Sequence, residues 1–306
     1  MKILVISSNL IGDTILSTGV IEHFLKLYPK AKFTFIVGPT SSQIYSHFPS
    51  LEDMMIIKKK KFNLHWLQMY WKNRAIKWDI IIDFRSSLLP YLFTVKKRYI
   101  FKKDNNFHHI DQLSKSFNLN ANSLKIYTSI TEEKEATKKI NKNFKYAVIF
   151  PGGNWTPKIW PIDNYNKLLI KLSQSYPKLC FIIVGSFDEK KKYLNEIKKK
   201  IPNEKIIDLM GETLTLTSAY MKKSDLFIGN DSGLMHLAFA SKLKTIALFG
   251  PTNDNHYGHK KDNCYIIRTK EDYNYFKKMN INIKRSYMQS IDIEQVFDTI
   301  TENKLL

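Results

Sequence analysis

The sequence predicts an α/β protein built from two doubly wound domains, each organised around a parallel sheet. Its 306 residues suit two compact domains, at roughly 150 residues per domain. Short β-branched runs alternate with helical patterns of apolar residues, and this alternation starts at residue 2 and again near residue 145. Hydrophobic residues make up 43% of the chain, which is enough for a sizeable core and excludes disordered and fibrous classes.

The first half opens with a strand, a helix and a second strand. Residues 2–7 (KILVIS) and 33–37 (FTFIV) are β-branched or aromatic runs typical of buried strands. Between them, up to Pro29, apolar side chains recur at helical spacing: Ile15, Leu16, Val20, Ile21, Phe24 and Leu25. A strand–helix–strand unit of this length implies parallel pairing. Residues 80–83 predict another buried strand, and residues 132–143 predict an exposed, charged helix.

The second half repeats the alternation from residue 146. Buried strands are expected at residues 146–150, 180–184, 206–209, 226–228 and 245–249, with helices between them. We therefore expect residues 1–143 to form the first domain and residues 144–290 the second. A closing helix is expected within residues 291–304, where Ile293, Val296, Phe297 and Ile300 recur at helical spacing.

The chain is strongly basic, with a formal net charge of +20. Residues 58–103 hold 13 basic and 2 acidic residues, and aromatic residues are interleaved among them. A basic, aromatic stretch suits single-stranded nucleic acid, and it suits the headgroup level of an anionic bilayer equally well. A Lys-rich composition without any anionic partner is the third explanation, so the charge alone does not identify a partner.

Membrane-spanning, secretory and metal-binding patterns are missing from the sequence. No apolar run approaches the ~18–20 residues of a spanning helix, and residues 1–7 are too short for a signal peptide, so we expect a cytoplasmic protein. Cys180 and Cys264 form no CxxC, which argues against a disulfide framework or a structural zinc site. Adjacent His108 and His109 point in different directions and have no evident third ligand, so no metal site is expected.

The loop after the first strand carries a carboxylate. Ligands of open α/β sheets bind beyond the carboxyl ends of the strands, and Asp13 follows the first strand there. Asp13 is suited to act as a general base, or alternatively to cap the following helix. The N-terminus of that helix is expected to lower the pKa of Asp13. The loop has no GxGxxG, which weighs against a dinucleotide-dependent oxidoreductase.

The first strand of the second domain runs into residues 151–161 (PGGNWTPKIWP). Gly152 and Gly153 free backbone N–H groups to face an anion, and Lys158 adds a positive point charge. A diphosphate needs these features. A Pro/Gly-rich connector with a solvated lysine would have the same residues, and the GxxxxGK[ST] of a Walker A loop is absent.

A second candidate anion site begins at Asp231. Ser232 and Gly233 offer a hydroxyl and amides at a helix N-terminus, and His236 lies one turn into that helix. The alternative is a helix cap followed by a core histidine, and the spacing does not fit a hydrolase triad. Glu189 either reaches a ribose hydroxyl or is one charge on a charged helix.

Taken in order, these stretches resemble glycosyltransferase family 9, the heptosyltransferases of lipopolysaccharide core assembly. The matching pieces are Gly12-Asp13 with Leu16-Ser17-Thr18, residues 78–87 (WDIIIDFRSS), 108–113, 150–161 and 229–251 (GNDSGLMHLAFASKLKTIALFGP). The Asp-Ser-Gly-x-x-His block, followed by a strand and Gly-Pro-Thr, is the most specific of them. Ser17-Thr18-Gly19 departs from the Thr-Pro pair common in the family, which leaves the identity of the acceptor open.

The resemblance implies a GT-B fold, in which two Rossmann-like domains face each other across a cleft. The first domain would bind the acceptor, the second would bind the nucleotide sugar, and the closing helix would pack back onto the first. The implied reaction is an inverting, metal-independent transfer of heptose from ADP-heptose to a lipopolysaccharide or lipooligosaccharide inner core. Asp13 would be the general base and Arg85 an acceptor contact. The implied donor contacts are Gly153, Asn154, Lys158, Glu189, Asp231, Ser232, Gly233 and His236.

A lipid-linked acceptor that carries phosphates would also explain the basic stretch at residues 58–103. It would place the protein peripherally at the cytoplasmic face of an anionic inner membrane, with no cofactor and no nucleic-acid partner. Two alternatives stay open. A non-hydrolysing sugar-nucleotide epimerase would share the fold and the donor site, whereas a nucleic-acid-binding protein would explain the charge but not the two anion-binding loops.

Overall fold

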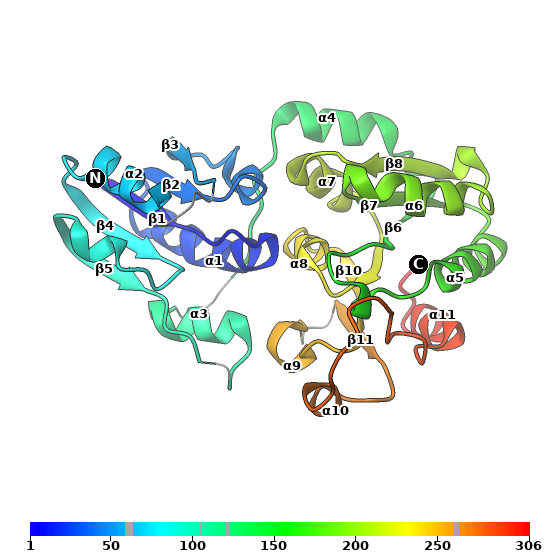
Figure 1. Ribbon diagram of the computed structural model, residues 1–306. Helices are drawn as coiled ribbons and strands as arrows, with labels where there is room; N and C mark the ends of the chain where they lie inside the picture. Colours follow the sequence, from blue (N-terminus) through cyan, green and yellow to red (C-terminus); the bar gives the residue numbers. More distant parts are fainter. Residues whose placement is uncertain (59–63, 105, 120–122, 260–262) are drawn as a thin grey trace. The chain divides into compact units, whose positions relative to one another are not determined.

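The computed structural model describes residues 1–306 except 59–63, 105, 120–122 and 260–262. The chain divides into two compact units, Met1–Tyr127 and Thr128–Leu306. Each unit contains one parallel sheet, which confirms the predicted fold class (Figure 1). Among the residues described, no helix combines the length and the apolar character needed to cross a bilayer.

The sheet of the first unit has five parallel strands in the spatial order β3-β2-β1-β4-β5. The strands are β1 (Lys2–Ile6), β2 (Lys32–Val37), β3 (Leu51–Ile56), β4 (Trp78–Asp83) and β5 (Val95–Ile100). The helices are α1 (Ile11–Leu27), α2 (Leu64–Asn73) and α3 (His109–Phe117), with 3-10 turns η1 (Ser41–Tyr45) and η3 (Leu89–Leu92). The central strand β1 is buried from Ile3 to Ile6, because both faces of the sheet are covered.

The two edge strands of this sheet, β3 and β5, have no counterpart among the strands that the sequence predicts. β5 (VKKRYI) exposes three consecutive basic side chains, and β3 (LEDMMI) exposes two acidic ones. Charged side chains are typical of edge strands because they discourage pairing with other chains. They also interrupt the apolar run from which a buried strand is recognised.

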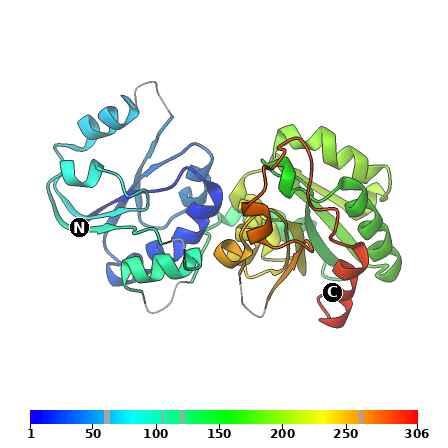
Figure 2. The same cartoon turned by 60° about the horizontal axis from the view of Figure 1, so that its bottom comes forward.

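The sheet of the second unit has six parallel strands in the order β11-β10-β9-β6-β7-β8. The strands are β6 (Lys145–Phe150), β7 (Leu179–Gly185), β8 (Ile206–Met210), β9 (Leu226–Asn230), β10 (Lys244–Phe249) and β11 (Cys264–Arg268). The helices are α4 (Ile130–Lys139), α5 (Ile162–Ser175), α6 (Phe187–Lys198), α7 (Leu214–Met221), α8 (Gly233–Ala240), α9 (Asp254–Tyr257), α10 (Tyr273–Lys277) and α11 (Ile293–Glu302); 3-10 turns are η4 (Thr156–Lys158) and η5 (Asn203–Lys205). Figure 2 shows the same elements from a second direction.

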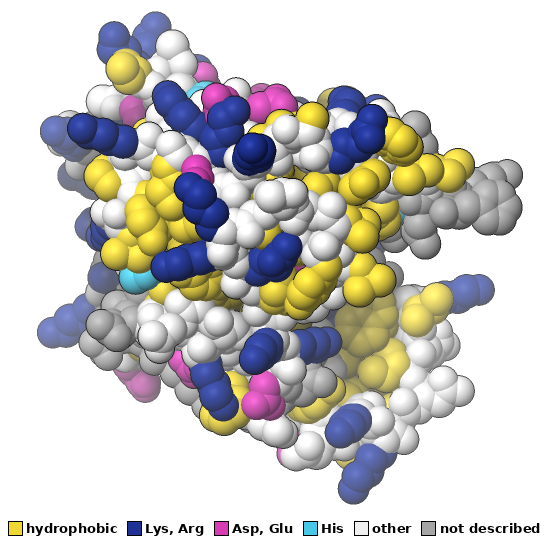
Figure 3. Space-filling model, turned by 90° about the vertical axis from the view of Figure 1, so that its left-hand side faces the viewer, with side chains coloured by type: hydrophobic (Ala, Val, Ile, Leu, Met, Phe, Trp, Pro, Cys, Tyr) yellow, Lys and Arg dark blue, Asp and Glu magenta, His cyan; other side chains and the backbone are white. Residues whose placement is uncertain are grey.

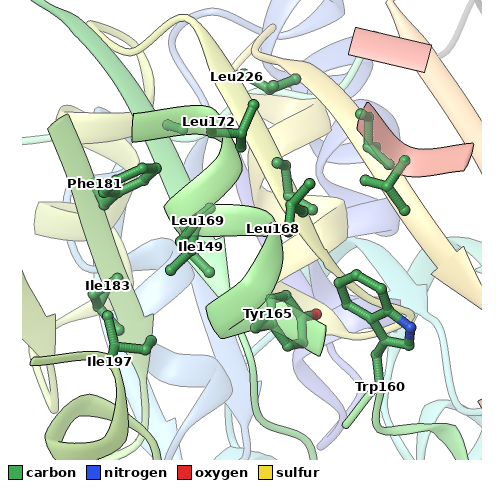
Figure 4. Packing of buried hydrophobic residues seen from close by; sticks show 14 of the residues in the cluster. Ile149, Trp160, Tyr165, Leu168, Leu169, Leu172, Phe181, Ile183, Ile197 and Leu226 are labelled. Atoms are coloured by element: carbon green, nitrogen blue, oxygen red, sulfur yellow. The ribbon is translucent and has the colours of Figure 1, made fainter. Parts of the chain in front are cut away.

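The core of the second unit lies between the sheet and helices α5, α6 and α11 (Figure 4). α5 supplies Leu168, Leu169 and Leu172, which pack on Ile149 of β6 and Phe181 of β7. All five side chains are fully buried, so each contributes about 1.5–3 kcal/mol of hydrophobic stabilisation relative to exposure.

The structure moves the boundary between the units to residues 127 and 128, whereas the sequence predicts it between 143 and 144. The reason is α4, which packs on α7 of the second unit. Tyr220 on α7 donates a hydrogen bond to Glu135 at 3.3 Å, and Lys222 forms an ion pair with Glu133 at 3.0 Å. A charged helix gives no sequence signal of which domain it covers.

The expectation that residues 291–304 pack on the first domain is also corrected. α11 lies in the second unit, where it contacts α5 and β11. Its Val296 and Ile300 are fully buried in the same core as Leu168. The helical spacing of α11 therefore predicts the element correctly but not its partner.

Candidate functional site

Each sheet contains one point where the strand order reverses, and all the predicted site residues except Glu189 follow the strands at these points. In the first unit the reversal lies between β1 and β4, and in the second it lies between β6 and β9. Ligands of doubly wound sheets bind at such switch points, beyond the carboxyl ends of the strands.

Asp13 lies in the first turn of α1, directly after β1. Leu10 occupies the N-cap position and no side chain caps the helix, so the capping role considered for Asp13 is wrong. Ser8 Oγ donates a hydrogen bond to Asp13 Oδ2 at 3.4 Å. Burial raises the pKa of Asp13, against the smaller opposing effects of Ser8 and of the positive charge on Lys103. The expectation of a lowered pKa is therefore wrong.

Arg85 lies in the loop after β4, and a buried carboxylate holds this loop in place. Asp83 is fully buried; its Oδ1 accepts from Arg85 N at 2.8 Å, and its Oδ2 accepts from Ser87 N at 2.7 Å. Burial raises the pKa of Asp83, although these hydrogen bonds act in the opposite direction. Ile6 of β1 pairs with Asp83 of β4, so the start of α1, which carries Asp13, and the loop that carries Arg85 follow strands that end at the same edge of the sheet.

In the second unit, the loop after β6 is held by Asn230 at the end of β9. The Asn230 side chain is fully buried; its Oδ1 accepts from Trp160 N at 3.0 Å, and its Nδ2 donates to Gly152 O at 2.8 Å. One side chain therefore fixes the loop at both of its ends. Asn154, a predicted donor contact within the same loop, is exposed.

Glu189 lies in the first turn of α6 and reaches the same loop. Its Oε1 accepts from Gly153 N at 2.7 Å, and its Oε2 accepts from the backbone N and Oγ of Ser186 at 2.9 and 2.8 Å. A Cβ on Gly152 would lie 2.1 Å from Glu189 Oε1, so a larger residue at this position would displace the carboxylate. The Gly153 amide, which the sequence predicts to face an anion, donates to Glu189 in this structure.

Lys158 and Asp231 come together, as their places after β6 and β9 predict. Lys158 Nζ lies 3.5 Å from Asp231 Oδ2, and both side chains are largely buried. Ser232 is the N-cap of α8, and its Oγ accepts from Met235 N at 3.3 Å. Gly233 is the first residue of α8, so a buried cation and a helix N-terminus lie at one switch point.

His236 lies one turn into α8, and it is buried. Its Nδ1 lies 2.9 Å from Nε2 of His259, which stacks on the Phe239 ring at a centroid distance of 3.6 Å. One of these two ring nitrogens donates and the other accepts, so His259 constrains the tautomer and the orientation of His236. No pattern in the sequence points to His259, because 23 residues separate the two histidines.

Among the residues that the structure describes, no three His, Cys, Asp or Glu side chains are grouped so as to hold a metal ion. The positive charge at the second half-site is supplied by Lys158 and by the backbone amides of α8. This arrangement suits an anionic group such as a diphosphate.

Comparisons with known proteins identify the family of the chain. The model of glycosyltransferase family 9 (heptosyltransferase) matches residues 77–285, more than half of the chain. Lipooligosaccharide heptosyltransferase 2 of Campylobacter jejuni serotype O:2 is 27% identical over 267 residues, which is 82% of each chain.

Two solved structures share the fold of the whole chain. A glycosyltransferase family 9 protein from Veillonella parvula superposes with a TM-score of 0.78 at 20% identity, over 99% of this chain and 97% of that one. Escherichia coli heptosyltransferase WaaC with ADP superposes with a TM-score of 0.74 at 15% identity, over 99% of this chain and 100% of that one. These similarities confirm the GT-B fold class.

Proposed function

Because the chain belongs to glycosyltransferase family 9, we propose that it transfers a heptose from ADP-heptose to the inner core of a lipopolysaccharide or lipooligosaccharide. The observation that carries the proposal is the meeting of Lys158 with the N-terminus of α8 at the switch point of the second sheet. The relative from Campylobacter jejuni is a lipooligosaccharide heptosyltransferase, and the Escherichia coli neighbour holds ADP, which supports this donor and acceptor.

The proposed reaction is a single displacement with inversion. The oxygen of an acceptor hydroxyl forms a bond to the anomeric carbon while the bond from that carbon to the diphosphate breaks. The hydroxyl proton moves to Asp13, and ADP leaves with the electron pair. A carboxylate whose pKa is raised by burial accepts this proton more readily than an ordinary aspartate would.

The second unit would hold the donor. Lys158 and the amides at the start of α8 would neutralise charge that develops on the departing diphosphate, which is how we account for a transfer without a metal ion. His236, fixed by His259, would complete the donor site together with Asp231. Asn154, Gly153 and Glu189 lie on the loop after β6 or against it, and we propose that they contact the nucleotide sugar.

The first unit would hold the acceptor, with Arg85 as a contact to an acceptor phosphate. A lipid-linked acceptor would bring the protein to the cytoplasmic face of the inner membrane as a peripheral protein. The epimerase alternative has the same class of fold, but the family match favours a transferase. A nucleic-acid-binding role would not account for the largely buried pair of Lys158 and Asp231 after the strands of the second sheet.

The donor site is tested by thermal unfolding of the full chain with ADP, UDP, GDP or a short single-stranded RNA. A ligand that binds only the folded state adds RT ln(1 + [L]/Kd) to the free energy of unfolding, which is about 2.7 kcal/mol at 100 times Kd. We expect ADP to give the largest shift, and Lys158→Ala to remove most of it. A shift with UDP alone would indicate a UDP-linked donor in place of ADP-heptose. A shift with RNA alone would contradict the transferase proposal.

A further inference from the structure

Helix α2 of the first unit has one buried side and an apolar stripe on the opposite, exposed side. His65, Met69 and Asn73, spaced i, i+4 and i+8, are buried, and Met69 packs in a core cluster with residues of the sheet. Leu64, Leu67 and Trp71, spaced i, i+3 and i+7, form a second stripe, and they are 50%, 52% and 55% exposed. The outer stripe adds nothing to the core, and a helix that only covered a sheet would have polar residues there.

The turn η3 continues this exposed apolar surface. It contacts α2, and the rings of Tyr70 and Phe93 stack between the two elements at a centroid distance of 6.0 Å. Leu88, Tyr91 and Leu92 at η3 are 80%, 62% and 59% exposed. Large apolar side chains are common singly on a protein surface, but six on two touching elements mark an interaction surface. We call these six residues the α2–η3 surface.

Cations lie directly on the aromatic members of the α2–η3 surface. The Arg74 guanidinium lies 4.1 Å from the centroid of Trp71, and that of Arg98 lies 5.8 Å from the centroid of Tyr91. Arg98 also holds η3 in place, because it donates to the backbone oxygens of Pro90 at 2.9 Å and Phe93 at 3.0 Å.

Acidic side chains are few in the stretch of chain that carries this surface. The only acidic residues in the described stretch 64–103 are Asp79, which forms an ion pair with Lys96 at 2.6 Å, and the buried Asp83. Figure 3, which views the side of the molecule that lies on the left in Figure 1, shows Lys and Arg side chains distributed among apolar ones. The surface is therefore both apolar and positively charged.

We propose that the α2–η3 surface docks on an anionic lipid bilayer. Its leucines and its aromatic rings would enter the boundary between headgroups and acyl chains, while Lys72, Arg74 and Arg98 stay at the level of the lipid phosphates. Single-stranded RNA is the other anionic partner that suits basic and aromatic residues. Four of the six side chains are leucines, which bury apolar area but cannot stack on bases, and this composition favours the bilayer.

The docking surface adjoins the acceptor half-site. The Arg85 guanidinium, in the loop after β4, lies 5.0 Å from the centroid of Trp66 on α2. This step rests on the proposed function: a lipid-linked acceptor would reach Arg85 without leaving the membrane. The docking itself is independent of catalysis and is tested separately from it.

The test is flotation of the full chain with two kinds of vesicle, one of phosphatidylethanolamine with phosphatidylglycerol and one of phosphatidylcholine alone. We expect binding to the anionic vesicles only, and weaker binding as salt is added. Lys72→Gln together with Arg74→Gln should weaken it by about 25-fold, since each charge near the surface accounts for about fivefold. Leu67→Gln together with Trp71→Gln should abolish it.

The matched control is Tyr275→Gln with Ile283→Gln, which removes two large side chains, 53% and 67% exposed, from the second unit. This control should bind the anionic vesicles as the unaltered chain does. Equal binding to both kinds of vesicle, or full binding by the α2 variants, would overturn the proposal. The proposal would also be overturned if the α2 variants lost binding to single-stranded RNA but still bound the anionic vesicles.

Transfer to a delipidated core oligosaccharide separates the docking from the proposed function. The α2 variants should transfer heptose to this soluble acceptor at the unaltered rate, while their transfer to vesicle-embedded acceptor falls. A chain that binds anionic vesicles but transfers to neither acceptor would support the docking and contradict the function. A chain that transfers to the soluble acceptor but does not bind anionic vesicles would support the function and contradict the docking.

Discussion

At Asp13, a helix N-terminus and burial act on the same carboxylate in opposite directions. The positive end of α1 favours the charged form, and removal from water disfavours it. The pKa is raised, and burial is the largest cause, ahead of the opposing effects of Ser8 and Lys103. The residue type and its place after β1 predict a carboxylate at the switch point, but only the packing around it decides the sign of the pKa shift.

Asp13→Asn removes the proton acceptor and keeps the shape of the side chain. We expect kcat to fall by about 10²–10⁴-fold, because that is the usual contribution of a positioned general base. The affinity for ADP should be unchanged. In the unaltered protein, kcat/KM should rise with pH through the raised pKa of Asp13, and the variant should lack this rise. A parallel loss of kcat and ADP affinity would indicate a structural role.

The same substitution has a predicted effect on stability. The folded state binds the Asp13 proton more tightly than the unfolded state, because its pKa is raised. The stability that this proton contributes is present at low pH and is lost as the pH rises through the folded-state pKa. Asp13→Asn should therefore be at least as stable as the unaltered chain in denaturant unfolding at pH 7. A clear loss of stability would contradict the burial argument.

Gly152 and Glu189 are predicted to be energetically coupled. Gly152→Ala would place a Cβ 2.1 Å from Glu189 Oε1, so the carboxylate must move and lose its bond to Gly153 N. A hydrogen bond to a charged group is worth about 1.5–3 kcal/mol, and we expect Gly152→Ala to cost about that much in the free energy of unfolding. In a Glu189→Ala background the same change should cost much less. Additive effects in this double-mutant cycle would contradict the contact.

At the scale of single elements, the buried strands can be predicted from the sequence and the edge strands cannot. β1, β2, β6, β7 and β10 are apolar runs, and each is predicted within one or two residues. β3 and β5 expose charges, and α2 has polar residues on its buried side and apolar ones on its exposed side, so neither a strand nor a helix pattern stands out. The same limit applies to the site: Asp83, Asn230 and His259 were missed because their roles arise from contacts made in the fold.

The place of α4 gives a prediction about where the chain can be cut. Residues 128–306 should fold alone and bind ADP, because this fragment contains α4, which packs on α7. Residues 144–306, which follow the boundary that the sequence predicts, would leave the buried residues of α7 uncovered, among them Tyr220 and Met221. We expect this shorter fragment to aggregate or to melt at a lower temperature. Equal melting temperatures would contradict the assignment of α4 to the second unit.

For the whole molecule, the proposed reaction assigns a different role to each unit. The first unit supplies the proton acceptor, and the second supplies a positively charged site for the diphosphate. Since Lys158 and the start of α8 would neutralise the leaving group, transfer should continue in excess EDTA at an unchanged rate. Lys158→Ala should lower the rate with and without EDTA. A rate that falls with EDTA and recovers with a divalent cation would contradict a metal-independent reaction.

The most direct measurement is a transfer assay in which the purified chain is incubated with ADP-heptose and a heptose-deficient core acceptor. Mass spectrometry then reports whether the acceptor gains a sugar, and nuclear magnetic resonance reports the anomeric configuration of the product. We predict the addition of one heptose with inverted configuration, together with release of ADP, and neither with Asp13→Asn. ADP release without a glycosylated acceptor, or a product of retained configuration, would contradict the proposed inverting transfer.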